Sequence, residues 1–305
     1  MEERYNSYSK YIRETFGERV QKISVDGGFT CPNRDGSKGR GGCTYCNNET
    51  FNPTHTSAKK SVREQLEEGI AFFEPKYKTQ KYLAYFQAYT NTYDTIEHLA
   101  DLYNQALSHS KVIGLVVSTR PDAINIKVVE LLSELAKENY VVVELGIEST
   151  INKSLKLINR CHTFQDTIDA YELLKDKGIH LGGHLIIGLQ GEGSDDFIEH
   201  AKQVSKLPIE FLKLHQLQII KGTVMAKQFS VNPEKFNLFT VDDYVREVVS
   251  FLGHLRSDIV LERFSSESPR DMLIAPKWGG LKNFEITEKI RKLLKTENIF
   301  QACNR

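Results

Sequence analysis

Short apolar runs rich in β-branched residues alternate with amphipathic segments along much of the chain. The runs are continuously apolar, so we expect strands that are buried on both faces, as in a parallel sheet. The expected strands are residues 20–25, 81–87, 112–118, 140–147, 179–187 and 210–217. Apolar residues at helical spacing predict helices between these strands. The expected helices are residues 95–107, 127–137, 164–177 and 195–206.

Polar residues at the starts of these helical segments predict where the helices begin. Asp94, Asn125, Thr163 and Ser194 precede the four segments and are the residue types that cap helix N-termini. Gly178 follows the third segment and is expected to stop that helix, because glycine readily adopts the left-handed conformation at a helix end.

Six strands that alternate with helices predict an α/β fold, a partial (β/α)6 TIM-like barrel with a carboxyl-terminal extension. We expect a core at residues 1–220 and an extension at residues 221–305 that packs on the core. The extension is less regular, with helices expected at 241–255 and 286–295 and a short strand near 259–262. In such folds, ligands gather at the carboxyl ends of the strands.

Composition adds few constraints. The chain has 40 Lys plus Arg and 40 Asp plus Glu, and this balance predicts no broad attraction to nucleic acid or membrane. The first sixteen residues, MEERYNSYSKYIRETF, lack the apolar run of a signal peptide, and no stretch approaches the roughly 18 apolar residues of a spanning helix. The sequence therefore predicts a cytoplasmic protein without a membrane partner.

Three of the five cysteines lie together in a loop directly after the first expected strand. The loop, GGFTCPNRDGSKGRGGCTYCNNETF, contains Cys31, Cys43 and Cys46 and ends at Phe51. Clustered thiols in a cytosolic protein favour a metal centre over disulfides. Three thiolates would leave one iron of a cubane cluster open for chemistry. A zinc site completed by His55 is the alternative that the loop alone leaves open.

The cysteine loop resembles the signature of the radical S-adenosylmethionine (SAM) superfamily, and Tyr45 matches the aromatic residue before its third cysteine. The resemblance implies that Cys31, Cys43 and Cys46 hold a [4Fe–4S] cluster whose fourth iron binds SAM. The first spacing is eleven residues instead of the usual three. A stretched spacing of this kind is typical of the branch that includes the elongator catalytic subunit.

The resemblance continues at the ends of the second and third expected strands. YFQAYTNTY occupies the place of the glycine-rich segment that contacts the methionyl amino group, which implies contacts from Gln87 and Ala88. STRPD is similar to the elongator branch's Glu-Thr-Arg-Pro-Asp and assigns Ser118 and Arg120 to the SAM site. Ser118 stands where Glu is usual.

The later strand ends are also similar to the superfamily. ELGIES implies that Glu148 lies near SAM. INRCHT resembles Asn-Arg-Gly-His, so Arg160 is expected to pair with the methionyl carboxylate, while Cys161 replaces the glycine. GGHLIIGLQGE resembles the fifth-strand motif that packs against the adenine, which implies that His184 and Ile186 line the same site.

These matches imply an enzyme that reductively cleaves SAM to a 5′-deoxyadenosyl radical, with flavodoxin or ferredoxin as electron donor. The tail, with SSESPRDMLIAPKW, extends the likeness to a bacterial family close to the elongator radical domain but without its acetyltransferase half. That family implies tRNA as the partner. The implied reaction converts 5-carboxymethylaminomethyluridine to 5-aminomethyluridine at the wobble position.

Two other functions remain open at this point. Oxygen-independent coproporphyrinogen oxidase shares several of the strand motifs, so a radical SAM enzyme acting on a small metabolite or tetrapyrrole is one alternative. A zinc-stabilised RNA-binding module is the other. A basic stripe in the tail is either a solvated helix face or an RNA contact, and it consists of Lys282, Lys289, Arg291, Lys292 and Lys295.

Overall fold

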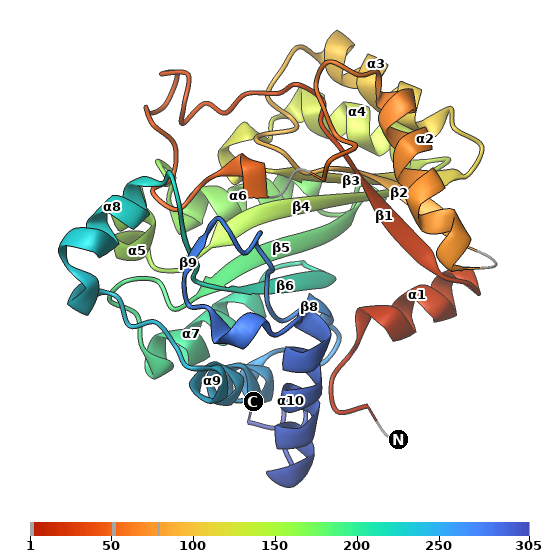
Figure 1. Cartoon of the computed structure of the whole chain (residues 1–305). Coiled ribbons are helices and arrows are strands. Elements are labelled where there is room, and N and C mark those ends of the chain that lie inside the picture. Colours follow the sequence, from red (N-terminus) through yellow and green to blue (C-terminus); the bar gives the residue numbers. More distant parts are fainter. Residues whose placement is uncertain (1–2, 51–52, 78–79, 305) are drawn as a thin grey trace.

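The computed structural model describes residues 3–50, 53–77 and 80–304. Phe51, the last residue of the expected cysteine loop, lies outside the described residues. A sheet of seven parallel strands curls into a partial barrel (Figure 1). Its order is β1 (Val20–Val25), β2 (Lys81–Phe86), β3 (Val112–Thr119), β4 (Tyr140–Glu148), β5 (His180–Ile187), β6 (Phe211–Gln216) and β8 (Val260–Arg263).

The expected partial barrel is confirmed, and a seventh strand joins the six expected ones. Residues 259–262 were expected to form a short strand of the extension, and the structure places β8 beside β6 in the main sheet. Phe211 pairs with Val260 and Leu212 with Leu261. This pairing is difficult to predict from the sequence, because β8 has only four residues and therefore no long apolar run. The extension thus supplies one edge of the sheet.

Helices cover the outer face of the sheet (Figure 1). They are α2 (Val62–Phe73), α3 (Ile96–Leu107), α4 (Ile126–Ala136), α6 (Phe164–Leu174) and α7 (Ser194–Val204). Helix α1 (Tyr8–Phe16) packs instead at the amino-terminal ends of the strands, and α5 (Asn152–Leu157) belongs to a separate apolar cluster. In the extension, α8 (Val224–Val231) precedes α9 (Val241–His254), and α10 (Asn283–Thr296) packs on α9. A two-stranded antiparallel ribbon joins β7 (Ile219–Ile220) to β9 (Leu273–Ala275). Among the described residues, no helix is long and apolar enough to cross a membrane.

Two of the four expected helix caps are confirmed and two are wrong. Asn125 caps α4 and Thr163 caps α6. Thr95, instead of Asp94, caps α3, because its hydroxyl accepts from the backbone of His98 while Asp94 pairs with the His98 ring.

Gly193, instead of Ser194, is the capping residue of α7. Its backbone N–H donates to Asp196 Oδ2 at 2.9 Å, so the acidic side chain of the first turn satisfies the helix start. Helix α6 ends at Leu174, three residues before the expected end at 177, and Gly178 follows in the left-handed conformation with φ of 74°.

The interior of the barrel is arranged in layers. At the amino-terminal ends of the strands, an apolar plug closes the interior, and the aromatic rings of α1 pack against it. The plug consists of Leu83, Tyr85, Val116, Val142, Phe211 and Val260. Closure at this end leaves the carboxyl ends of the strands as the open mouth of the barrel.

A layer of buried charges lies above the plug. Lys22 Nζ contacts Glu144 at 2.8 Å and Glu262 at 2.7 Å, and Lys213 Nζ contacts the same two carboxylates at 2.7 and 3.1 Å. Tyr85 accepts from Lys213 at 3.2 Å. Burial by itself would raise the pKa of Glu144, but the two lysines hold that pKa well below its ordinary value. Glu144 is therefore ionised, and the lysines compensate its charge.

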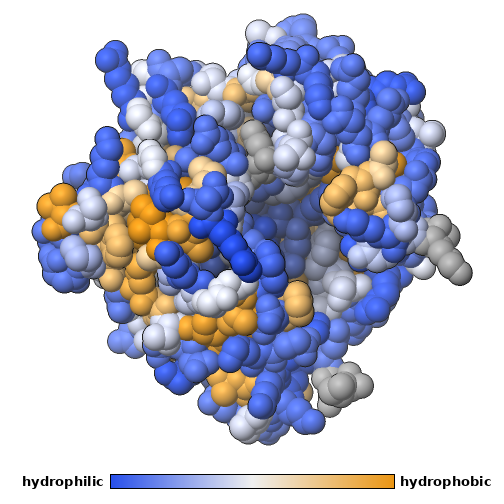
Figure 2. Space-filling model, viewed as in Figure 1, coloured by the Kyte–Doolittle hydropathy of each residue, from blue (hydrophilic) through white to orange (hydrophobic). Residues whose placement is uncertain are grey.

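The two edges of the sheet, β1 and β8, do not pair with one another. Residues of the amino-terminal segment cover part of the β8 edge, where Leu261 donates from its backbone to Asn6 at 2.8 Å and bridges to Ser7. The face of the molecule in this view is hollowed near its centre, and hydrophilic atoms surround most of the hollow (Figure 2).

Candidate functional site

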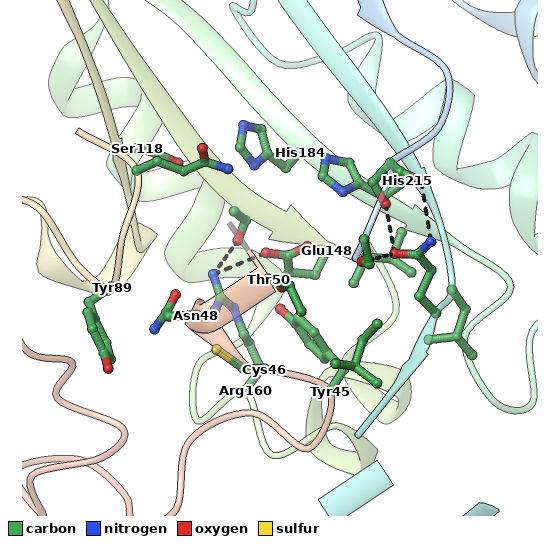
Figure 3. Close-up of a pocket in the computed structure, with 18 of the residues that line it drawn as sticks. Tyr45, Cys46, Asn48, Thr50, Tyr89, Ser118, Glu148, Arg160, His184 and His215 are labelled. Atoms are coloured by element: carbon green, nitrogen blue, oxygen red, sulfur yellow. Dashed lines mark hydrogen bonds and ion pairs between the residues drawn. The ribbon is translucent and has the colours of Figure 1, made fainter. Parts of the chain in front are cut away.

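A cavity of about 160 Å³ opens at the carboxyl ends of the barrel strands (Figure 3). Most of the residues expected at the SAM site line this cavity: Tyr45, Cys46, Gln87, Ser118, Arg120, Glu148, Arg160, His184 and Ile186. Cys31, Cys43 and Ala88 are not part of its lining. Residues expected to share a site from six separate sequence segments therefore meet in one cavity.

The cysteine loop is attached to the segment after β4. Thr44 donates from its backbone to Ile158 O at 2.9 Å, and Asn33 Nδ2 donates to Asn159 O at 2.6 Å. Asn33 Nδ2 also lies 3.6 Å from Cys43 Sγ. Burial raises the pKa of the Cys46 thiol to about 11, and neighbouring Cys43 adds to that shift. The loop therefore brings the Cys46 thiol to the cavity wall, with Cys43 buried behind it.

Arg160 joins the cysteine loop to the strand ends. Its Nη1 donates to Cys43 Sγ at 3.5 Å, its Nη2 donates to Gly146 O at 2.9 Å, and Nη2 lies 3.6 Å from Glu148 Oε1. Its Nε is buried without a partner among the described residues. A buried guanidinium that has an unused donor is suited to an anionic group in the cavity.

Arg120 is held in a fixed orientation by Asp122. Nε and Nη2 donate to the two carboxylate oxygens at 2.9 and 3.0 Å, and Nη2 also donates to Arg160 O at 2.7 Å. Although burial opposes it, this bidentate pair lowers the pKa of Asp122 to about 2. Nη1 of Arg120 is buried and has no partner in the described part of the chain. The cavity wall thus contains a second unused cationic donor.

Four residues other than glycine adopt the left-handed conformation in or beside the cavity wall: Tyr89 and Glu148 line the cavity, and Asn159 and Cys161 flank Arg160. Tyr89 has φ of 63°, Glu148 has φ of 63° and Cys161 has φ of 59°. Cys161 occupies the position of the glycine in the family motif. Glycine adopts the left-handed conformation freely, whereas a residue with a side chain adopts it at an energetic cost. Backbone strain of this kind is concentrated at functional sites. The position of these strained residues therefore supports a functional role for the cavity.

Two histidines on neighbouring strands line the cavity, with ring centroids 5.5 Å apart. His184 Nε2 donates to the ionised Glu144 at 2.9 Å, so Nδ1 of the neutral ring is the acceptor. His215 Nε2 lies 2.8 Å from Arg263 Nη2 and must accept, because a guanidinium only donates. Burial lowers the pKa of both rings, and both are neutral. The pair therefore carries opposite tautomers.

Sequence reasoning missed part of the cavity wall. The additional lining residues are Asn48, Thr50, Tyr89, Thr119, Gly146, His215, Gln216, Leu217, Gln218, Ile220, Ser266 and Ser268. His215 lies within an apolar strand, and only its position near the end of that strand indicates the mouth of the barrel. Ser266 and Ser268 come from the extension, and no spacing in the sequence connects them to the strand ends.

Two protein-family models match most of the chain. The model of the Radical SAM superfamily matches residues 33–204, and that of the Radical_SAM C-terminal domain matches residues 209–296. The chain is 34% identical to the uncharacterized protein YtqA of Bacillus subtilis over 99% of this chain and 92% of that protein. It is 35% identical to protein YhcC of Escherichia coli (strain K12) over 90% of this chain and 87% of that protein.

The chain is also similar, at lower identity, to parts of larger proteins. The tRNA uridine(34) acetyltransferase of Methanocaldococcus infernus is 25% identical over 68% of this chain, which spans only 37% of that protein. The solved structure of the archaeal Elp3 of the same organism matches with a TM-score of 0.70 at 19% identity, over 92% of this chain and 64% of that one. That structural likeness shows a shared fold. The family match over most of the barrel shows that the chain belongs to the radical SAM superfamily, whose enzymes use a [4Fe–4S] cluster and S-adenosylmethionine.

Proposed function

We propose that this protein cleaves SAM reductively and acts on tRNA, converting 5-carboxymethylaminomethyluridine at the wobble position to 5-aminomethyluridine. The observation that carries the radical chemistry is the meeting of Cys46, Arg160 and the strand-end residues in one cavity. The tRNA substrate is supported by similarity to the tRNA uridine(34) acetyltransferases and by the fold shared with archaeal Elp3.

The cysteine loop fits an iron–sulfur cluster better than a zinc ion. His55 directs Nε2 to the Ser24 carbonyl at 3.3 Å, away from a role as fourth ligand. Among the described residues, no three His, Cys, Asp or Glu side chains are gathered closely enough to hold a single metal ion. Structural zinc needs four ligands within about 2.3 Å. A cubane is larger, so its three ligands stand farther apart.

We assign Cys31, Cys43 and Cys46 as the cluster ligands. The loop's hydrogen bonds to Cys43 come from Asn33 and Arg160, and hydrogen bonds to ligand sulfurs tune an iron–sulfur centre. When bound, the reduced cluster supplies the electron that cleaves SAM into methionine and a 5′-deoxyadenosyl radical. The high pKa of the Cys46 thiol means that metal binding must displace its proton.

The remaining cavity residues have the chemistry to bind SAM. The unused donors of Arg160 and Arg120 suit the methionyl carboxylate. Glu148 and Ser118 supply an acceptor and a hydroxyl for the amino group and the ribose. Gln87, Ala88, His184 and Ile186 are assigned to the same site by their positions at the ends of β2 and β5. The closed lower end of the barrel helps to exclude water from the reacting groups.

The test uses reconstituted protein under anaerobic conditions with SAM and dithionite. The substrate is tRNA that carries 5-carboxymethylaminomethyluridine at the wobble position. We expect formation of deoxyadenosine together with 5-aminomethyluridine, both measured by mass spectrometry of the products and the digested tRNA. Deoxyadenosine without a change in the tRNA would reject the tRNA substrate and favour a small metabolite or tetrapyrrole.

A cysteine variant tests the cluster assignment separately. Cys43→Ala should lose bound iron and the ability to form deoxyadenosine, because it removes one of three thiolate ligands. Cys303→Ser is the matched control, since Cys303 is an exposed thiol in the carboxyl-terminal segment and its nearest side-chain partner is Asn304. A Cys43→Ala protein that retains iron and makes deoxyadenosine would contradict the assignment. A zinc-loaded wild-type protein that never forms deoxyadenosine would favour the RNA-binding module.

A further inference from the structure

A second cavity of about 320 Å³ lies directly beside the catalytic cavity. The two cavities share four wall residues, which are Gln216, Gln218, Ser266 and Ser268. The far wall of the second cavity comes from the extension, between Glu267 and Lys282. A ligand that occupies the catalytic cavity can therefore continue into the second one without leaving the protein surface.

The loop that separates the cavities is held in place by strand-end side chains. Gln216 accepts from Ser266 N and donates to Ser266 O, both at 2.9 Å. Gln218 Oε1 accepts from Ser268 Oγ at 2.7 Å. Pairing of β7 with β9 attaches the next part of the loop to the barrel. The charged residues of this loop are thus presented on a preformed wall, which lowers the entropic cost of binding.

The second cavity has an excess of positive charge. Of its four charged lining residues, Glu267 and Lys282 neutralise one another at 2.9 Å. Arg270 and Lys277 form no ion pair within the part of the chain that the structure describes. A Cβ at Gly280 would lie 2.9 Å from Arg270 Nη2, so the glycine leaves room for the guanidinium beside the backbone. Two uncompensated cations therefore face one cavity next to the catalytic site.

We propose that Arg270 and Lys277 bind a phosphodiester of the RNA backbone next to the nucleotide whose base enters the catalytic cavity. This inference rests on the proposed tRNA substrate. A base in RNA is joined through its ribose to phosphates on either side, so a base in the first cavity brings a phosphate close to it. A guanidinium fork with a lysine ammonium is suited to phosphate oxygens. Neither contact reads sequence, so this site positions the RNA.

The test compares the salt dependence of tRNA binding in matched variants. Arg270→Gln/Lys277→Gln removes the two cations that would neutralise one phosphodiester, so the slope of log K against log[salt] should become shallower by about 0.7, at roughly 0.7 per neutralised phosphate of single-stranded RNA. We expect the affinity at low salt to fall by roughly tenfold. Arg270→Lys/Lys277→Arg keeps both charges and should retain most of the slope.

A second double variant controls for net charge. Lys292→Gln/Lys295→Gln removes two lysines from α10 that form no ion pair among the described residues. Other members of the same basic stripe are already paired, Lys282 with Glu267, Lys289 with Asp242 and Arg291 with Glu288. This control should leave the slope nearly unchanged.

The outcomes separate this inference from the proposed function. Wild-type protein that binds and modifies tRNA, with an unchanged slope in the Arg270→Gln/Lys277→Gln variant, would overturn only the phosphodiester site. Equal losses in the loop and α10 variants would also overturn it, because net charge alone would then explain both. Wild-type protein that binds no tRNA would overturn the proposed function and this inference together.

Discussion

Arg263 donates from Nη2 to Nε2 of His215 at 2.8 Å, across the neighbouring strands β8 and β6. Because a guanidinium has no acceptor, this contact places the proton of the neutral imidazole on Nδ1. His215 lines the cavity at the strand ends, so it offers an N–H donor there. A strand contributed by the extension thus determines the protonation of a side chain in the core of the barrel.

Replacing Arg263 by Met should remove the hydrogen bond that keeps the proton of His215 on Nδ1, so that either tautomer can form. Burial and the Arg263 charge together hold the pKa of His215 well below its ordinary value, so this pKa should rise when the charge is removed. Nitrogen-15 NMR of histidine-labelled, cluster-free protein would report both the pKa and the tautomer. His254, whose Nδ1 lies 2.9 Å from Ser250 O, provides an internal reference. An unchanged His215 spectrum would refute this coupling.

Adding a methyl group at Gly146 should weaken SAM binding. A Cβ at this position would lie 2.4 Å from Arg160 Nη2 and 2.6 Å from Glu148 Oε1, so both side chains must move. Loss of one charge-assisted hydrogen bond costs about 1.5–3 kcal/mol, so the affinity of Gly146→Ala should fall by about tenfold or more.

Equilibrium binding of SAM to reconstituted protein would measure this loss. Gly193→Ala is the matched control, because a Cβ there meets nothing within 4 Å and its backbone is already extended. Equal affinities of the two variants would show that Arg160 and Glu148 do not contact SAM.

The buried charges of the barrel interior should be strongly coupled. Glu144→Gln leaves Lys213 and Lys22 facing a neutral amide, and breaking a buried ion pair costs about 3–5 kcal/mol of unfolding free energy. Lys213→Met should cost a similar amount, since it removes a partner of both carboxylates. The double variant should lose less than the sum of the single variants by about 1–3 kcal/mol. Urea unfolding of cluster-free proteins would test this, and additive losses would contradict the coupling.

His162 should make the protein less stable as the pH falls below neutrality. Burial and the Arg160 charge lower the pKa of His162 to about 3 in the folded protein. An unfolded chain has a histidine pKa of about 6.5, so it takes up the proton first, and the free energy of unfolding decreases as the pH falls from about 6.5 to 3. The contribution is at most about 1.4 kcal/mol per pH unit, or roughly 2 kcal/mol by pH 5.

Unfolding of the His162→Asn variant would test this sign. The variant should show a flatter dependence of unfolding free energy on pH between 6.5 and 5, because its side chain does not titrate. His98→Asn is a suitable control because His98 is exposed. Asp122, whose pKa is lowered to about 2, contributes only at lower pH and does not obscure this window. A wild-type slope in His162→Asn would reject the explanation.

The sequence by itself determined the alternation of strands and helices in the barrel. Continuous apolar runs located all six expected strands to within one or two residues, because burial on both faces requires side chains of one kind. The resemblance to the radical SAM superfamily implied one site for Cys46, Arg160 and Glu148, and these residues line one cavity because the carboxyl ends of parallel strands meet at the same edge of a sheet.

Only the tertiary structure decided what completes the cavity. Ser266 lies far from the strand ends in sequence and reaches the cavity through its contacts with Gln216. Strand β8 is so short that its pairing with β6 cannot be predicted from its sequence. This pairing nevertheless places Arg263 against His215. Local sequence patterns reflect which residues are buried and which favour turns. Contacts between distant segments depend on how the whole chain packs, and no spacing along the sequence encodes them.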